Sequence, residues 1–538
     1  MDAVRTLLWG ASARGVGSAG AGLAQAMRLA PAALVVIAIC IFALQFYVQR
    51  YFLHDDALIS LRFARNLLQH GVLEWNIGER VEGYTNFLHL LVTTGVMWLG
   101  FDPVVAVRIV NVAAMAGLLA GFWGLLRRAA PGDDGRAARA LGLSLVLLSA
   151  PFVIWVLGGL ETVMAAALLT AGVGLLLPLG DDRELQFRRQ VLAGLALGCA
   201  VLTRPDCVVP AGAALAGYLL LAPRRLLDRV RVVGVVGGVL AAVVLAHVAW
   251  RYGYYGDLLP NTYYAKVGVP ISLRLQNGGP YLLGALVRVP VLWIAGLMLM
   301  MAALDRRVSP AMGILAAAIG CQAGNVVWAG GDHMPASRLL VPVMALAALL
   351  AALALQAMSE AVRGFWLVAA GAMATYGAVT TDIEHKDSAA FVGTIVGRHL
   401  EANEKPGTVV ALTTAGSTPY FAPSLRFIDT LGLVDRTIAR RDPLPFLSLN
   451  QRVPGHAKGY GAYVLARRPH LVILGTAPGS DVSEPWWLSD VELMRSEEFH
   501  RCYRREDHAL RYGAAEAREK PGYVNPIAFI VYRRHCAK

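Results

Sequence analysis

Long apolar stretches without charged residues recur along most of the first 381 residues. This pattern is typical of membrane-spanning helices, which need about 20 predominantly apolar residues each. The first stretch lacks a small-residue cleavage site, so we expect it to be a retained helix rather than a signal peptide. The pattern predicts eleven spans, near residues 31–52, 104–126, 139–157, 160–179, 190–203, 207–222, 231–252, 281–303, 311–329, 339–357 and 364–381.

The connectors between these spans differ in charge. Those at 127–139, 183–189, 224–231 and 305–307 are short and rich in arginine, and Arg5, Arg14 and Arg28 precede the first span. Basic connectors mark the cytoplasmic side. The predicted topology has a cytoplasmic N-terminus, and it places on the outside 53–103, 158–160, 203–206, 253–280, 330–338 and everything after 381.

The stretch 85–101 is apolar enough to count as a further span. A crossing there would place the arginines of 127–139 outside and would invert every later basic connector. We therefore expect a re-entrant or membrane-surface helix within the outer loop 53–103.

Composition supports the membrane assignment and divides the chain. Of the 538 residues, 56% are hydrophobic and only 16% are charged, whereas soluble domains contain about a quarter charged residues. A cytosolic globular enzyme and a disordered chain are thereby excluded. The net charge of +12 fits basic cytoplasmic connectors, so we expect a lipid bilayer and no nucleic acid as a partner. Charged residues number 39 in 382–538, against 47 in 1–381.

This change in charge density predicts a transmembrane domain, 1–381, and an extracytoplasmic domain, 382–538. The second contains short β-rich runs at Val409–Leu412, His470–Leu474 and Ile527–Tyr532, which predict an α/β or β-rich fold. Its two cysteines, Cys502 and Cys536, lie on the oxidising side of the membrane and are expected to form a disulfide. The alternative is two unpaired thiols.

The first outer loop carries a polar helix face. If a helix starts at Asp55-Asp56, five polar residues share one face: Asp55, Arg62, Arg65, Asn66 and Gln69. This face could turn an acid and two guanidinium groups toward a site. The alternative is an amphipathic surface helix whose aspartates cap its first turn.

Other outer junctions also carry ionisable groups, which are costly at a membrane boundary and usually mark a site or pair with each other. Each cluster alone could be a structural ion pair. All of them lie on the same predicted side, however, and this favours one polar site at the outer membrane surface. The residues are Glu161, Arg204, Asp206, Asn261, Tyr263, Lys266, Asp332, His333 and Arg338.

These residue types suit glycosyl transfer from a lipid donor. Arginine and lysine bind phosphate, a carboxylate can deprotonate an acceptor hydroxyl, and tyrosines suit sugar faces. Nucleotide sugars are not available outside the cell, so an activated sugar would arrive on a polyprenyl phosphate. We find no Cys/His metal cluster and no nucleotide-binding loop, and we predict no cofactor and no required metal. A lipid flippase and a non-catalytic glycan-binding membrane protein remain alternatives.

Five segments carry a family resemblance: HDDALISLRFARNLLQHGVLEWNIGERVEGYTNFL, GGLET, LTRPD, YGDLLPNTYYAK and GGDHMPASRLLVP, within residues 54–342. Gly432–Asp435 and Pro454–His456 add two motifs in the C-terminal part. Together they resemble the actinobacterial terminal arabinofuranosyltransferases, which belong to the GT-C superfamily of polytopic membrane glycosyltransferases. The resemblance covers most of the chain.

The resemblance implies an inverting enzyme of the bacterial plasma membrane that uses decaprenyl-phosphoryl-arabinofuranose. Its acceptor would be cell-wall arabinan or another envelope glycan, which the C-terminal domain would help to hold. The resemblance also implies a catalytic aspartate in the first outer loop. The resemblance further implies that the residues named above are site residues in this chain, together with Glu82 and His456. At His456-Ala457-Lys458 relatives commonly have an acidic residue, which this chain lacks.

Asp55 is the predicted base because it shares the polar face with Arg62 and Asn66, whereas Asp56 aligns with Ser60 and Phe63. Asp56 is the alternative base, and Glu82 is expected to orient the acceptor. For the donor phosphate, two or more of five cations are expected to converge: Arg62, Arg65, Arg204, Lys266 and Arg338.

Overall fold

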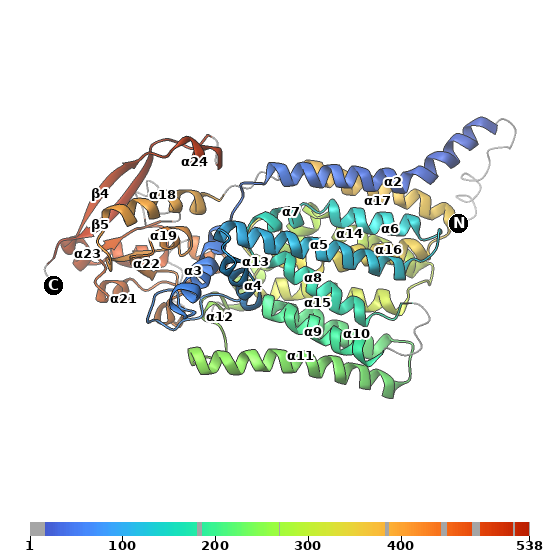
Figure 1. The fold of residues 1–538 in the computed structure, drawn as a ribbon, viewed down its shortest axis with the longest axis horizontal. Coiled ribbons are helices and arrows are strands. Elements are labelled where there is room, and N and C mark those ends of the chain that lie inside the picture. Colours follow the sequence, from blue (N-terminus) through green and yellow to red (C-terminus); the bar gives the residue numbers. More distant parts are fainter. Residues whose placement is uncertain are drawn as a thin grey trace.

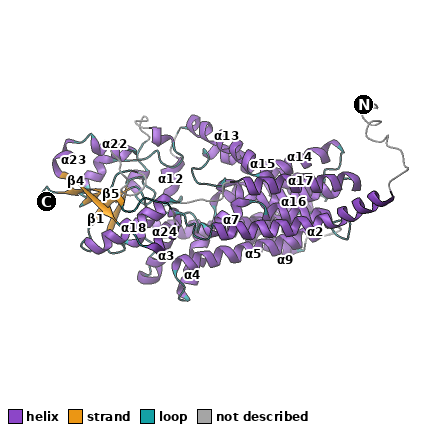
Figure 2. Cartoon of the chain, turned by 90° about the horizontal axis from the view of Figure 1, so that it is seen from above, coloured by secondary structure: helices purple, strands orange, loops and turns teal. Residues whose placement is uncertain are grey.

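The computed structural model describes residues 17–179, 186–267, 270–381, 387–442, 449–475, 485–519 and 522–536. A helical body extends to Thr380, and a C-terminal domain beginning with α18 lies against one end of it (Figure 1). All strands in the described part of the chain belong to the C-terminal domain (Figure 2). Arg5, Arg14, residues 183–185 of the connector at 183–189 and residues 382–386 beside the predicted domain boundary lie outside the described residues.

The helical body follows the apolar stretches of the sequence. Its helices are α2 (Gly17–Val48), α3 (Asp55–His70), α4 (Phe87–Trp98), α5 (Pro103–Ala129), α6 (Arg136–Leu147), α7 (Ala150–Leu157), α8 (Thr162–Leu176), α9 (Phe187–Thr203), α10 (Val208–Leu221), α11 (Leu226–Tyr255), α12 (Asn261–Val267), α13 (Ile271–Arg288), α14 (Pro290–Leu304), α15 (Pro310–Ala329), α16 (Val341–Ala357) and α17 (Glu360–Thr380), with 3₁₀ turns at Pro205–Cys207 and Arg338–Leu340.

In the described residues, five helices are long and apolar enough to cross a membrane, and two bent helix pairs raise this number to seven. Three shorter apolar helices accompany them. The chain is thus a multi-pass membrane protein, and the count of eleven spans stays a prediction. α16 lies at the centre of the bundle, packed by α6, α8, α14 and α15, and it is buried along most of its length.

One stretch predicted as a straight span is broken. Residues 281–303 divide between α13 and α14, which meet at Val289 with a bend of 83°. Pro290 explains the break, because proline has no backbone N–H to donate and its ring clashes with the carbonyl four residues earlier.

The stretch 85–101 forms α4, which has 12 residues. A helix of this length is about 18 Å long, well short of the roughly 30 Å hydrocarbon core. α4 packs on α3, α5 and α9. Its length is that expected of a helix that does not cross the membrane.

The C-terminal domain is built on a five-stranded sheet in the order β2-β1-β3-β5-β4. β2, β1 and β3 are parallel, whereas β5 runs antiparallel to β3 and β4. The strands are β1 (Val409–Leu412), β2 (Arg426–Asp429), β3 (Leu471–Val472), β4 (Tyr503–Leu510) and β5 (Ile527–Arg534), so β1, β3 and β5 lie at the three β-rich runs of the sequence. The helices around them are α18 (Ser388–Asn403), α19 (Ser417–Phe421), α20 (Arg436–Ala439), α21 (Gly461–Ala466), α22 (Leu488–Met494), α23 (Glu497–Cys502) and α24 (Ala514–Glu519), with a 3₁₀ turn at Leu449–Arg452.

The disulfide predicted between Cys502 and Cys536 is confirmed. It joins the residue before β4 to the end of β5, across the edge of the sheet. The cysteines in or beside the predicted spans are free thiols: Cys207 is buried, Cys199 is partly buried, and Cys40 and Cys321 are exposed. The position of these residues predicts four buried thiols, which is wrong for Cys40 and Cys321.

Replacing both Cys502 and Cys536 with serine is expected to destabilise the C-terminal domain by roughly 3–4 kcal/mol, the loop-closure value for a cross-link of this sequence separation. Thermal unfolding of the purified protein checks this expectation. Cys321→Ser is the matched control, since Cys321 is an exposed thiol of the helical body. An unchanged unfolding temperature of the Cys502→Ser, Cys536→Ser double variant would contradict this expectation.

Candidate active site

The polar face of α3 binds the C-terminal domain. The Asp55 carboxylate accepts hydrogen bonds from the backbone N–H groups of Gly416 (3.0 Å) and Ser417 (2.7 Å), at the start of α19. The Asp55 N–H in turn donates to Asp387 (2.8 Å). Burial, together with the nearby charge of Asp387, raises the pKa of Asp55 to about 7. Asp55 therefore holds two parts of the chain together.

The other charged residues of this face do the same. Arg62 is buried and donates to the carbonyls of Trp75 (2.8 Å) and Pro419, and Arg65 donates to the carbonyl of Tyr420 (2.8 Å). Arg62 and Arg65 are not among the described lining of the central, cationic and interdomain chambers, so the structure does not bring them to the predicted phosphate position. The sequence placed them on one face, but the C-terminal domain covers that face, and the carbonyls of Pro419 and Tyr420 accept from them.

This contact leaves no room for a side chain at Gly416, because a Cβ there would overlap the Asp55 backbone and carboxylate. Gly416→Ala is expected to lower the free energy of unfolding of the C-terminal domain by about 2–4 kcal/mol through overlap and lost hydrogen bonds. Faster hydrogen exchange of the Gly416 and Ser417 amides would report it. Gly513→Ala, where a Cβ meets only the end of the Glu516 side chain, is the control. Unchanged amide exchange in the Gly416 variant would refute the coupling.

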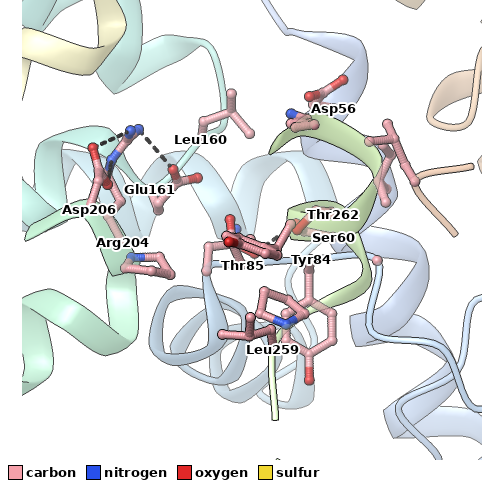
Figure 3. A pocket seen from close by; sticks show the side chains of 18 of the residues that line it. Asp56, Ser60, Tyr84, Thr85, Leu160, Glu161, Arg204, Asp206, Leu259 and Thr262 are labelled. Atoms are coloured by element: carbon pink, nitrogen blue, oxygen red, sulfur yellow. Dashed lines mark hydrogen bonds and ion pairs between the residues drawn. The ribbon is translucent and has the colours of Figure 1, made fainter. Parts of the chain in front are cut away.

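A central chamber of about 320 Å³ lies between α3, the loop before α4, the start of α8 and α12. Figure 3 shows Asp56 across this chamber from Glu161, Arg204 and Asp206. Its polar lining includes Asp56, Ser60, Tyr84, Thr85, Asn86, Glu161, Arg204, Asp206, Thr262, Tyr263, Lys266 and Arg338.

One wall of the central chamber is an ion cluster at the start of α8 and the end of α9. The Arg204 guanidinium binds both Asp206 oxygens (3.0 Å each) and one oxygen of Glu161 (3.2 Å). These partners occupy the planar fork of Arg204, so its main effect is to hold two carboxylates in the chamber wall. Arg204 thus lines the central chamber with its charge already balanced, and its role in binding the donor stays a prediction.

A second, cationic chamber of about 200 Å³ adjoins the first at Lys266 and Arg338. Arg338 binds Asp332 (3.0 Å), and His333 lies 3.5 Å from the same carboxylate. Arg338 and His333 outweigh burial and lower the pKa of Asp332, which therefore stays ionised. Further basic residues of this chamber are Arg274 and Arg452.

A third chamber of about 210 Å³, the interdomain chamber, lies where α3 and α12 meet the C-terminal domain. His456 stacks on Trp487 with ring centroids 4.7 Å apart and meets His333 edge-on at 4.6 Å. Burial lowers the pKa of His456 to about 4, so its imidazole is neutral at pH 7. The loops after the parallel strands β1 and β2 complete the lining with Thr413, Thr414, Ala415, Leu431 and Leu433.

Asp56 borders both the central and the interdomain chamber. Burial would raise its pKa, but four nearby basic side chains outweigh burial and lower it: His54, Lys266, His333 and Arg338. Asp55 also borders the interdomain chamber, yet both of its carboxylate oxygens accept backbone hydrogen bonds. Of the two predicted bases, Asp56 thus borders both chambers, whereas the Asp55 carboxylate is bound to α19, and the identity of the base stays a prediction.

Two further sequence-predicted residues support the site from outside the chambers. Glu82 is buried and binds Arg251 with both carboxylate oxygens (2.5 and 3.2 Å), which leaves it poorly placed to orient an acceptor. The Asn261 amide donates to the carbonyls of Gly432 and Leu433 and so fixes α12 to the C-terminal domain. Neither side chain is among the described lining of the three chambers.

Sequence reasoning missed Arg251, Asp387 and Trp487. Arg251 carried a usable signal, because a lone arginine near the outer end of an apolar span usually has a partner. Asp387 and Trp487 belong to a domain whose contact with the helical body has no local signature.

Parts of the chain are similar to known proteins. Residues 381–518 match a family described as a domain of unknown function, DUF8728. Over 234 residues the chain is 35% identical to a terminal β-(1→2)-arabinofuranosyltransferase of Mycobacterium tuberculosis, covering 40% of this chain and 35% of that protein. The enzyme of the same name from Corynebacterium glutamicum is 31% identical over 245 residues, 40% of this chain and 33% of that protein.

Over these stretches the chain is similar to the two terminal arabinofuranosyltransferases. It matches about a third of the length of these two curated relatives. Among solved structures, ArnT from Cupriavidus metallidurans bound to undecaprenyl phosphate shares the fold, with a TM-score of 0.52 at 14% identity over 74% of this chain and 85% of that one. The chain therefore has a fold similar to that of ArnT.

Proposed function

We propose that this protein is a membrane glycosyltransferase. It would move a sugar from a polyprenyl-phosphate donor to a hydroxyl group of an extracytoplasmic glycan. The similarity to the arabinofuranosyltransferases favours arabinofuranose as this sugar. One observation carries the proposal: the central chamber is lined by an ionised carboxylate, Asp56, and by two cations, Lys266 and Arg338, that also border the cationic chamber. The names of the relatives support the same activity.

The cations suit the leaving group. When the sugar departs, the lipid phosphate keeps about two negative charges, so a positive side chain beside it stabilises the transition state more than the ground state. Lys266 and Arg338 stand where the central and cationic chambers meet, with the sugar in the first and the phosphate toward the second. Because these side chains supply the positive charge, the proposed reaction needs no metal ion at the phosphate.

Asp56 suits the base. It borders the central chamber and, on the other side, the interdomain chamber. An acceptor hydroxyl held in the interdomain chamber would attack the anomeric carbon and pass its proton to the Asp56 carboxylate as the bond to phosphate breaks. Attack from the side away from the phosphate inverts the anomeric configuration. The C-terminal domain would hold the acceptor with the loops around Thr413 and His456.

The orientation follows the basic connectors. We propose that the N-terminus is cytoplasmic and that the three chambers and the C-terminal domain face the outside of a bacterial plasma membrane. The acceptor would be cell-wall arabinan or another envelope glycan.

The test is to incubate the purified protein in lipid nanodiscs with decaprenyl-phosphoryl-arabinofuranose and an arabinan oligosaccharide. Release of decaprenyl phosphate together with a longer oligosaccharide is expected. Unchanged activity in the presence of a chelator would agree with a metal-independent reaction. In liposomes, movement of the donor across the bilayer without turnover would indicate a flippase. Binding of the oligosaccharide with neither turnover nor movement would indicate a glycan-binding protein.

A further inference from the structure

A chain of hydrogen-bonded polar side chains runs behind the lining of the central chamber. Its members are Ser60 on α3, Asn86 before α4, His89 on α4 and Asn111 on α5. Ser60 and Asn86 line the chamber at one end of the chain, and Asn111 at the other end binds the carbonyl of Leu160, which also lines it. Asn86, His89 and Asn111 are buried. Buried polar groups are costly unless they are hydrogen-bonded, so this chain is a specific arrangement.

The direction of the hydrogen bonds is fixed from the Asn111 end. The carbonyls of Trp155 (3.4 Å) and Leu160 (3.1 Å) can only accept, so the nitrogen of the Asn111 amide donates to them. The amide oxygen of Asn111 is then left for Nε2 of His89, which lies 3.0 Å away. An amide oxygen only accepts, so Nε2 of His89 carries a proton.

His89 passes this direction on to Ser60. Burial lowers the pKa of His89, so its ring is neutral at pH 7, and a proton on Nε2 leaves Nδ1 as an acceptor. The Asn86 amide nitrogen lies 3.5 Å from Nδ1 and is therefore the donor to it. The amide oxygen of Asn86 accepts from the Ser60 hydroxyl (3.1 Å). The hydroxyl proton of Ser60 is thus committed to Asn86, and Ser60 presents its oxygen lone pairs to the central chamber.

Ser60 lies one turn after Asp56 on α3, and both side chains line the central chamber (Figure 3). A serine hydroxyl that rotates freely can donate or accept, so it would pair with a hydroxyl group of a sugar or with an ether oxygen. Ser60 held by Asn86 pairs only with a group that donates. It therefore complements a sugar hydroxyl and does not complement a ring oxygen.

We propose that Ser60 accepts a hydrogen bond from a hydroxyl group of the donor sugar, and that His89 is the positioning residue that holds Ser60 as an acceptor. The inference rests on the proposed function, which places the sugar in the central chamber. His89 is not among the described lining of that chamber, so its effect reaches the sugar through Asn86 and Ser60.

The test measures how much the sugar contributes to donor binding. Affinities for decaprenyl-phosphoryl-arabinofuranose and for decaprenyl phosphate are measured by native mass spectrometry of the protein in nanodiscs. Their ratio isolates the sugar, because the two lipids share the isoprenoid chain and the phosphate. The variants are Ser60→Ala, His89→Leu, both together, and His89→Gln. Thr93→Val is the matched control, because Thr93 is buried one turn further along α4 and valine has nearly the same shape.

Ser60→Ala is expected to lower the affinity ratio by about three- to tenfold, the contribution of one hydrogen bond. His89→Leu should lower it by about two- to fivefold, since Asn86 loses the partner that orients it. In the Ser60→Ala background, His89→Leu should have no further effect, because the two residues act in series. His89→Gln should recover most of the loss, since its amide can donate to Asn111 and accept from Asn86. Thr93→Val should keep the parent ratio.

Two results would overturn the inference. If His89→Leu lowers the ratio by the same factor with and without Ser60, its effect does not pass through the Ser60 hydroxyl. An unchanged ratio for Ser60→Ala overturns the inference by itself, whether or not the leucine variant folds. Transfer of arabinofuranose by the parent protein, measured separately, reports on the proposed function, so failure of the inference in an active parent is distinguishable from failure of that function.

Discussion

Replacing Asp56 with asparagine is expected to reduce sugar transfer by about 10²- to 10⁴-fold, the usual contribution of a general base. Asparagine keeps the size and most hydrogen bonds of the side chain but cannot accept the acceptor proton. Donor binding should be unchanged, because the phosphate is bound by Lys266 and Arg338. Single-turnover transfer and binding of decaprenyl phosphate, measured on the same preparation, separate the two effects.

Asp507→Asn is the control, because Asp507 is an exposed carboxylate on β4. Asp55→Asn makes the comparison sharper. Its amide group cannot accept from both Gly416 and Ser417, so we expect lower stability of the interdomain contact and a smaller loss of transfer than in Asp56→Asn. Full activity of Asp56→Asn alongside an inactive, well-folded Asp55→Asn would return the role of base to Asp55.

Lys266→Met is expected to lower kcat/KM by about 10²- to 10³-fold, the range found when one preorganised charge partner of a transition state is removed. Lys266 borders all three chambers, and methionine keeps much of its apolar length without the charge. Steady-state transfer kinetics with decaprenyl-phosphoryl-arabinofuranose give the measurement. Lys405→Met, at an exposed lysine before β1, should behave like the parent.

The same variant should alter the pH profile. A base works only when deprotonated, so activity falls as the pH drops through the pKa of Asp56. In the parent that pKa lies below the ordinary value of 3.8, and activity should be constant from neutral pH down to about 4. Lys266 is one of the groups that lower it, so its loss should move the acid limb to higher pH. If the activity of Lys266→Met falls at the same pH as that of the parent, the Lys266 charge does not act on Asp56.

Several features were accessible from the sequence because they depend on local chemistry. The scarcity of charges over long stretches predicted a multi-pass membrane protein, and arginine-rich connectors distinguished the predicted cytoplasmic loops from the loops that supply the site. The pairing of Cys502 with Cys536 followed from their number and their predicted compartment. Lys266, Arg338 and the Glu161–Arg204–Asp206 cluster were placed at one site because their loops are predicted to lie on one side of the membrane.

Other features were decided by tertiary contacts alone. Helical periodicity grouped Asp55 with Arg62 and Arg65, but it could not show that a domain more than 300 residues later covers that face. Covering it satisfies those charges with backbone groups and leaves Asp56, one residue away and about 100° around the helix, to face the chambers. In the same way, hydropathy predicted one span over 281–303, and only the structure shows that the chain bends at Pro290. Which side of a helix meets solvent depends on its neighbours, and the local sequence does not contain them.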